Sequence, residues 1–182
     1  AWCKMVLPTS YMGSGEWYRL FLANPSSVQI EVMESFPKQT YRNRCTITTP
    51  DGPLTLSIPV TRADSKQLTR DVEISYQQRW QHQHWIALTS AYKRTPYFDY
   101  YADFFRPFYE KETKFLVDFN EKIHEVIVRL MANQAKGEEA KRLLGKNRTT
   151  DWQGLDLEPC FGNGQSILDL LFEYGPETIM KI

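Results

Sequence analysis

The sequence predicts an α+β fold in which an N-terminal, mostly antiparallel sheet with a hairpin at residues 41–60 precedes a helical C-terminal half. Hydrophobic residues make up 42% and charged residues 24% of the chain, which is ordinary for a globular protein. Segments with strand-like alternation come first and segments with helical periodicity follow. This order favours α+β over strict βαβ alternation. The 182 residues fit a single domain, residues 1–182, with one hydrophobic core.

The first third of the chain predicts two strands and a helix. Residues 4–7 form a short apolar run that predicts a strand. The glycine-containing turn at residues 13–15 leads into an amphipathic helix that carries Trp17 and Phe21 on its apolar face. Residues 28–34 alternate between apolar and polar side chains, a pattern typical of a half-buried strand.

The hairpin is the strongest local signal. Two extended runs, residues 41–48 and 54–60, flank Pro-Asp-Gly-Pro at residues 50–53. Asp-Gly supplies the positive φ that a tight turn needs, and the two prolines exclude a helix through it. Pro59 has no N–H group, so the second strand is expected to lie at a sheet edge or to end there.

Helical periodicity begins at residue 80. One helix is predicted from Trp80 to Tyr92, because Thr95-Pro96 then breaks it. An aromatic helix is predicted over residues 99–109 with Pro107 in or near its last turn. A long apolar stripe predicts one continuous helix over residues 113–132.

The C-terminal part predicts two short helices around a loop. A charged helix is expected between Gly137 and Gly145, and a polar, glycine-containing loop over residues 146–164. Ser166 and Asp169 form the pattern of a capping box, which predicts a last helix over residues 167–172.

Charge and cysteine content exclude several classes of protein. The 22 Lys and Arg residues balance the 22 Asp and Glu residues, so long-range attraction to nucleic acid or an anionic membrane is not expected. No apolar run approaches the roughly 20 residues that span a bilayer. Cys3, Cys45 and Cys160 are widely spaced without C-x-x-C, and no signal peptide is visible; both features predict a cytoplasmic protein.

A polar string at residues 38–44 is the candidate binding site. On a strand, Arg42 and Arg44 would point to the same side, about 7 Å apart. Two guanidinium groups at this spacing suit a phosphate or carboxylate, because each can donate paired hydrogen bonds. The alternative is an edge strand that its charges protect against aggregation. The glycine-containing turn at residues 13–15, before a helix N-terminus, offers a second, less specific place for an anion.

The histidines offer one candidate base and no metal site. His82, His84 and His124 lack metal-ligand spacing, and no cofactor motif is present, so neither a metal nor a cofactor is expected. His84 lies on the apolar face of its helix, either as a hydrogen-bonded core imidazole or as a general base in a cleft. His124 lies beside the apolar stripe of its helix and is expected to be an ordinary surface residue. The aromatic content of 14% leaves two alternatives open, a ring-rich core and a surface that stacks on a planar or sugar ligand.

Four stretches together resemble the WbqC-like protein family of bacteria. They are L-P-T-S-Y at residues 7–11, K-Q-T-Y-R-N-R-C at 38–45 with L-S-I-P-V at 56–60, the segment from Trp80 to Phe98, and S-I-L-D-L-L-F at 166–172. The resemblance covers about residues 5 to 176, and K-Q-T-Y-R-N-R-C is its most specific part. The family takes its name from a protein of O-antigen and surface-polysaccharide gene clusters, and many members have no assigned reaction.

The resemblance itself implies little chemistry, and it adds weight to the polar string as a site. The leading hypothesis is a transferase or other enzyme that acts on a nucleotide-activated or otherwise anionic sugar precursor in surface polysaccharide biosynthesis. His84 is the candidate catalytic base. The candidate substrate-binding residues are Lys38, Gln39, Tyr41, Arg42, Asn43, Arg44, Tyr11 and Tyr92. The rival interpretation is a non-catalytic binding or assembly protein, and nucleic-acid processing comes third. An anionic small molecule is the expected partner, with no nucleic acid and no membrane span.

Overall fold

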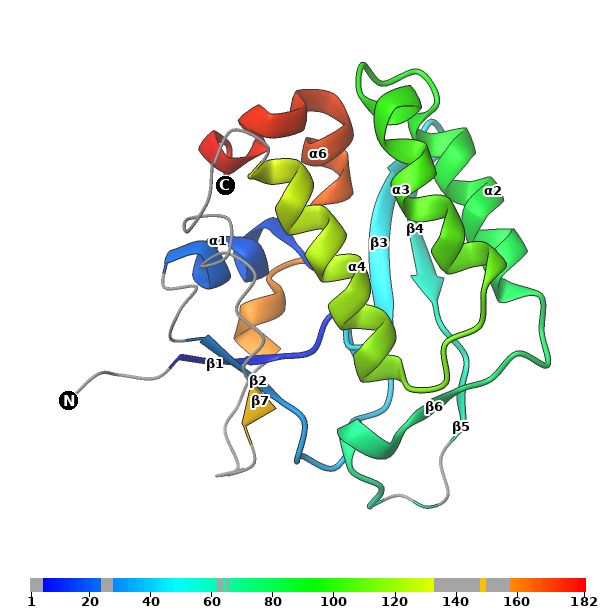
Figure 1. Cartoon of the computed structure of the whole chain (residues 1–182), viewed down its shortest axis with the longest axis vertical. Helices are drawn as coiled ribbons and strands as arrows, with labels where there is room; N and C mark the ends of the chain where they lie inside the picture. The colour runs from blue at the N-terminus through cyan, green and yellow to red at the C-terminus, as the bar shows by residue number, and fades with distance from the viewer. Residues whose placement is uncertain (1–4, 24–27, 62–63, 65, 133–147, 150–157) are drawn as a thin grey trace.

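The computed structural model describes residues 5–23, 28–61, 64, 66–132, 148–149 and 158–182 (Figure 1). The α+β class is confirmed. The helices are α1 Gly15–Ala23, α2 Trp80–Tyr92, α3 Phe98–Glu110, α4 Leu116–Met131 and α6 Leu168–Tyr174. The strands are β1 Met5–Pro8, β2 Val28–Glu31, β3 Arg44–Thr49, β4 Gly52–Ser57, β5 Val60–Thr61, β6 Glu73–Ile74 and β7 Arg148–Thr149. Short 3₁₀ turns span Thr69–Asp71, Glu158–Phe161 and Gly175–Met180.

Strands β1 and β2 form a small parallel sheet with α1 as the crossover between them. Met5 pairs with Val28 and Pro8 with Glu31, and β7 joins the far side of β2. This βαβ unit adds parallel pairing to the antiparallel pairing expected from the sequence. It also places a two-residue strand at 148–149, inside the segment that was expected to be a loop.

The predicted hairpin is confirmed. Thr49 pairs with Gly52, which leaves Pro50 and Asp51 as the turn, and Gly52 has a φ of +111°. Strand β4 ends at Ser57, before Pro59, as the missing N–H predicts. Strand β3 starts at Arg44, later than residue 41, because residues 41–43 form a turn. A second antiparallel pair joins β5 to β6.

The long helices follow their apolar stripes. Helix α2 has the predicted bounds, and α3 contains Pro107. Helix α4 begins at Leu116 and not at residue 113, because the backbone of Phe115 is extended and forms a bridge with Glu73. The helix predicted between Gly137 and Gly145 lies outside the described residues. No helix in the described part of the chain is long and apolar enough to cross a membrane.

The last helix starts differently from the capping box that the sequence predicts. The Leu168 N–H group donates to the Ser166 side chain at 3.2 Å, but helix α6 has no side-chain cap from Asp169. The Asp169 carboxylate instead accepts hydrogen bonds from Thr48 and Tyr92, in β3 and α2. Residues far apart in the chain therefore compete successfully with the local cap.

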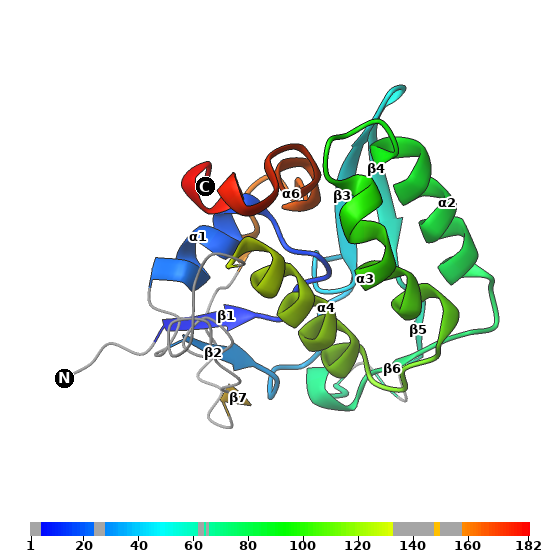
Figure 2. The same ribbon diagram turned by 45° about the horizontal axis from the view of Figure 1, so that its top comes forward.

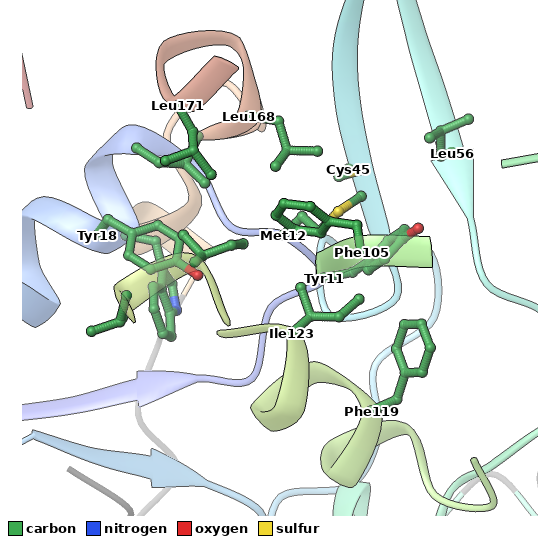
Figure 3. Packing of buried hydrophobic residues seen from close by; sticks show 14 of the residues in the cluster. Tyr11, Met12, Tyr18, Cys45, Leu56, Phe105, Phe119, Ile123, Leu168 and Leu171 are labelled. Carbon is green, nitrogen blue, oxygen red and sulfur yellow. The ribbon is translucent and has the colours of Figure 1, made fainter. Parts of the chain in front are cut away.

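Helix α4 lies at the centre of the molecule. In both views (Figures 1 and 2) it runs between the α1 side and the pair formed by α2 and α3, while β3 and β4 are seen beside and behind α3. Figure 3 shows one core that gathers side chains from the β1–α1 loop, β3, α3, α4 and α6. Examples are Tyr11, Cys45, Phe105, Phe119 and Leu168, each 1% exposed or less. Many of the aromatic rings thus belong to the core.

Gly175 ends α6 in a conformation that a side chain does not tolerate. Its φ is +56°, and a Cβ atom there would lie 2.5 Å from the ring of Tyr97. Gly175→Ala should lower the free energy of unfolding by about 2 to 4 kcal/mol in urea titrations, from backbone strain plus the clash. Gly52→Ala is the matched control, because Gly52 also has a positive φ but its Cβ would meet nothing within 4 Å. Equal losses in the two variants would contradict the clash.

Candidate functional site

Arg42 is a buried structural residue in this fold. Its side chain is 2% exposed, and its Nε and Nη2 atoms donate to the two carboxylate oxygens of Glu34 at 2.5 and 3.1 Å. The guanidinium group also lies 5.4 Å from the ring centre of Phe161. The sequence placed Arg42 and Arg44 on one strand; the structure corrects this, because Arg42 lies in the turn before β3. The two guanidinium groups therefore lack the strand spacing on which the predicted binding of a phosphate or carboxylate by Arg42 and Arg44 depended.

The backbone of the same string holds other elements in place. The Tyr41 carbonyl accepts hydrogen bonds from Ser10 Oγ at 3.3 Å and from the Tyr11 N–H group at 3.2 Å. The Arg42 carbonyl accepts from Asn120 Nδ2 at 2.8 Å, which ties the string to α4. The backbone of the string thus links the β1–α1 loop to α4 through hydrogen bonds.

The remaining side chains of the string are divided between surface and interior. Lys38 and Gln39 are exposed in the bend before the turn. The Asn43 amide donates to the Ile58 carbonyl at 2.9 Å. Asn43 Oδ1 and Arg44 Nε are buried without a hydrogen-bond partner among the described residues. No described cavity brings Arg42, Arg44 and His84 together.

His84 belongs to a buried hydrogen-bond network. Its Nε2 atom lies 3.0 Å from the Ser57 carbonyl, which can only accept, so Nε2 carries the proton. Nδ1 then accepts from the Tyr11 hydroxyl at 2.9 Å, and the Tyr109 hydroxyl lies 2.8 Å from that of Tyr11. Desolvation lowers the pKa of His84 to about 4. Both ring nitrogens are occupied and the residue is 5% exposed, which favours the core-imidazole interpretation.

Tyr92 and Tyr41 line no described cavity themselves, but each hydrogen-bonds to a residue that lines a groove at the start of α1. Tyr92 donates to Asp169 Oδ1 at 2.5 Å, and the Tyr41 hydroxyl donates to the Asn163 carbonyl at 3.4 Å. Asp169 also accepts from the Thr48 N–H and hydroxyl groups and from Gln165. These bonds fix the orientation of the Asp169 carboxylate.

The groove itself, which we call the α1 groove, has a volume of about 410 Å³, within the range of small-molecule sites. Its lining comes from the start of α1, from the loop before α6, from α6 and from the end of the chain. The lining residues are Ser14, Gly15, Glu16, Arg19, Asn163, Gln165, Ser166, Asp169, Leu170, Lys181 and Ile182. Most of them offer hydroxyl, amide or charged groups.

The positive charge of the α1 groove comes from two side chains and one helix end. Arg19 forms an exposed ion pair with Glu16 at 2.8 Å, and Lys181 lies 4.9 Å from the ring centre of Tyr174. The first N–H groups of a helix lack acceptors inside the helix, and here the Trp17 N–H donates to Ser14 Oγ. The partial positive charge of the α1 N-terminus therefore faces the same region as two cations.

A second groove of about 380 Å³ lies beside β5 and β6. Its charged lining consists of Glu73, Glu112 and Lys114, and Lys114 is ion-paired with Glu73 at 3.3 Å. Excess negative charge makes this groove a poor site for an anion. In the described part of the chain, no three His, Cys, Asp or Glu side chains gather as metal ligands.

The sequence did not identify Arg19, Gln165 and Lys181 as site residues. Arg19 and Gln165 are about 146 residues apart in the chain, and Gln165 and Lys181 about 16. No spacing rule connects the three positions. The glycine-containing turn at residues 13–15 was the one local signal that pointed to this place.

Comparison with known proteins identifies a family and no individual relative. The sequence model of the WbqC-like protein family matches residues 30–158, which is more than half of the chain. No curated protein and no solved structure matches the sequence.

The Arg42–Glu34 pair should be essential to folding. Arg42→Met leaves a buried carboxylate without its partner and should lower the free energy of unfolding by about 3 to 5 kcal/mol. Lys38→Met, at an exposed position of the same string, should change it by less than about 0.5 kcal/mol. Urea titration measures both. The double variant Arg42→Met/Glu34→Leu should recover part of the loss; a loss of similar size for Lys38→Met would contradict the assignment.

Acid should destabilise the protein through His84. The folded-state pKa of about 4 lies below the unfolded value of about 6.5, so the unfolded chain binds more protons between these values. Stability is therefore present above pH 6.5 and is lost as the pH falls toward 4, by about 2 kcal/mol between pH 7 and pH 5 for this residue. His84→Phe should reduce this slope, measured by urea titration at several pH values. His82→Gln, a substitution at an exposed position of the same helix, is the control.

Proposed function

The chain belongs to the WbqC-like protein family, and we propose that it binds a nucleotide-activated or otherwise anionic sugar precursor in the α1 groove. The observation that carries the proposal is the groove of about 410 Å³ that combines two cations with a lining of amide, hydroxyl and carboxylate groups. As the family resemblance implies, we assign this precursor to surface polysaccharide biosynthesis.

The chemistry of the lining suits both parts of such a ligand. A sugar hydroxyl donates one hydrogen bond and accepts others, so it pairs well with amides and carboxylates such as Gln165 and Asp169. A phosphate takes charge-assisted hydrogen bonds from Arg19 and Lys181 and lies favourably near the N-terminus of α1. Asp169 is already oriented by Thr48 and Tyr92, so little side-chain ordering is needed on binding.

Two activities are compatible with this ligand. The first is a transferase or related enzyme that acts on the precursor. The second is a binding or assembly protein without turnover. In the enzyme, Glu16 would be the candidate acid or base, since it lines the groove and is 54% exposed.

Isothermal titration against a panel of nucleotide sugars and sugar phosphates tests the binding. Replacing both cations, in Arg19→Gln/Lys181→Gln, should weaken binding by roughly tenfold or more for each charged hydrogen bond lost. Folding should be unaffected, because both side chains are exposed and surface ion pairs contribute little. Lys114→Gln is the matched control, because it removes a cation from the other groove and should leave the affinity unchanged.

The same titrations separate the outcomes. If a ligand that binds the wild type binds the double variant with unchanged affinity, the α1 groove is not the binding site. Release of nucleotide from a bound nucleotide sugar would support the enzyme, whereas tight binding without turnover would support the binding protein.

A further inference from the structure

A cavity much smaller than either groove lies between the loop after β1, helix α1 and helix α4. Its volume is about 20 Å³, and Thr9, Ser10, Trp17, Asn120 and His124 contribute to its walls. A cavity of this size holds about one water molecule if two or more polar partners are present. It shares no lining residue with the α1 groove, so this cavity is independent of the proposed sugar site.

Asn120 contributes one hydrogen-bond acceptor without a partner. Its side chain is 2% exposed, and Nδ2 donates to Thr9 Oγ1 at 3.0 Å and to the Arg42 carbonyl at 2.8 Å. Because a carbonyl only accepts, the Arg42 contact fixes which side of the amide is nitrogen. Oδ1 is therefore assigned without ambiguity, and among the described residues it has no hydrogen-bond partner.

His124 contributes the complementary donor. Its ring packs against Trp17, Tyr18 and Phe21, with ring centres 5.1, 5.4 and 4.5 Å away. Desolvation lowers the pKa of His124 to about 3, so the imidazole is neutral at physiological pH. The residue keeps some exposure, but Nε2 itself is buried and lacks a partner within the described part of the chain.

Tyr18 decides which nitrogen of His124 carries the proton. The Tyr18 hydroxyl lies 3.1 Å from Nδ1, and this is the hydrogen bond that the described residues offer it. A buried hydroxyl that donates to Nδ1 satisfies both groups, whereas a protonated Nδ1 would leave the hydroxyl proton without an acceptor. Nδ1 is therefore the acceptor, and Nε2 carries the unpartnered N–H group.

From this complementary pair, we propose that the cavity is a binding site for one neutral hydroxyl group, which accepts from His124 Nε2–H and donates to Asn120 Oδ1. In the ligand-free protein this group is a water molecule; in a complex it is an alcohol group of a ligand. An anion is disfavoured by Asn120 Oδ1 and by the carboxylate of Glu121, which also lines the cavity. A cation is disfavoured by the N–H group of His124.

The location supports a ligand subsite as well as a structural water site. Thr9 and Ser10 directly follow β1, and β1 is parallel to β2. In parallel sheets, ligands bind at the carboxyl ends of the strands. The Ser10 hydroxyl donates to the Tyr41 carbonyl, which leaves its oxygen able to accept the second proton of a water molecule.

The first test is the tautomer of His124 in the wild-type protein. Long-range ¹H–¹⁵N NMR spectra should show a protonated Nε2 and an unprotonated Nδ1, with an Nε2–H resonance that has a cross-relaxation peak to water. His124→Phe, which keeps the ring packing, should remove these signals and identify them. A protonated Nδ1 would overturn the proposal, because the cavity would then present two acceptors and would suit a cation.

The second test is crystallographic and distinguishes the two sources of the hydroxyl group. A high-resolution structure should show one oxygen within hydrogen-bond distance of both His124 Nε2 and Asn120 Oδ1. In crystals soaked in methanol, replacement of this oxygen by the alcohol would support the ligand subsite, and retention of the water would support the water site. An empty cavity, or a metal ion or anion in it, would overturn the proposal.

Discussion

The buried ion pair between Arg42 and Glu34 is the constraint on which the arrangement of the polar residues depends. A guanidinium group that is 2% exposed needs a carboxylate partner, because an unpaired charge in the interior is very costly. Glu34 meets this need through two hydrogen bonds, and Phe161 covers the guanidinium group. With Arg42 held in this way, the adjacent carbonyls of Tyr41 and Arg42 are fixed where the β1–α1 loop and α4 hydrogen-bond to them.

This arrangement indicates a structural role for the polar string at residues 38–44. Its Arg, Asn and Tyr residues resemble a binding surface when read along the chain, yet their described contacts are largely internal. Arg42 forms an ion pair with Glu34, and the Asn43 amide donates a hydrogen bond to the Ile58 carbonyl. The Tyr41 ring packs against the Phe161 ring, with 5.8 Å between the ring centres. The string acts on the sites indirectly, by positioning Ser10 and Asn120 at one cavity and by approaching Asn163 at the α1 groove.

Local features of the structure were predictable from local patterns. The bounds of α2 follow from helical periodicity, the hairpin follows from Asp-Gly, and the end of β4 follows from Pro59. Each of these signals acts within a few residues. The parallel pairing of β1 with β2 and the contact of Asp169 with Thr48, 121 residues away, depend on tertiary packing. His124 was expected at the surface for the same reason: its helical position beside the apolar stripe was correct, but the aromatic residues of α1 that enclose it lie more than 100 residues earlier.

The β1–α1 loop connects the two proposed sites, and its anchors explain how it keeps both in shape. On one side, the Tyr41 carbonyl holds the Ser10 hydroxyl and the Tyr11 N–H group. On the other side, Ser166 Oγ donates to the Met12 carbonyl and the Ile167 N–H donates to the Gly13 carbonyl. A loop anchored at both ends loses little further freedom when a ligand binds, so more of the interaction energy contributes to affinity. The two sites also differ in size and chemistry: the α1 groove of about 410 Å³ presents two cations and suits an anionic sugar, whereas the cavity of about 20 Å³ presents one acceptor and one neutral N–H donor and suits a single hydroxyl group.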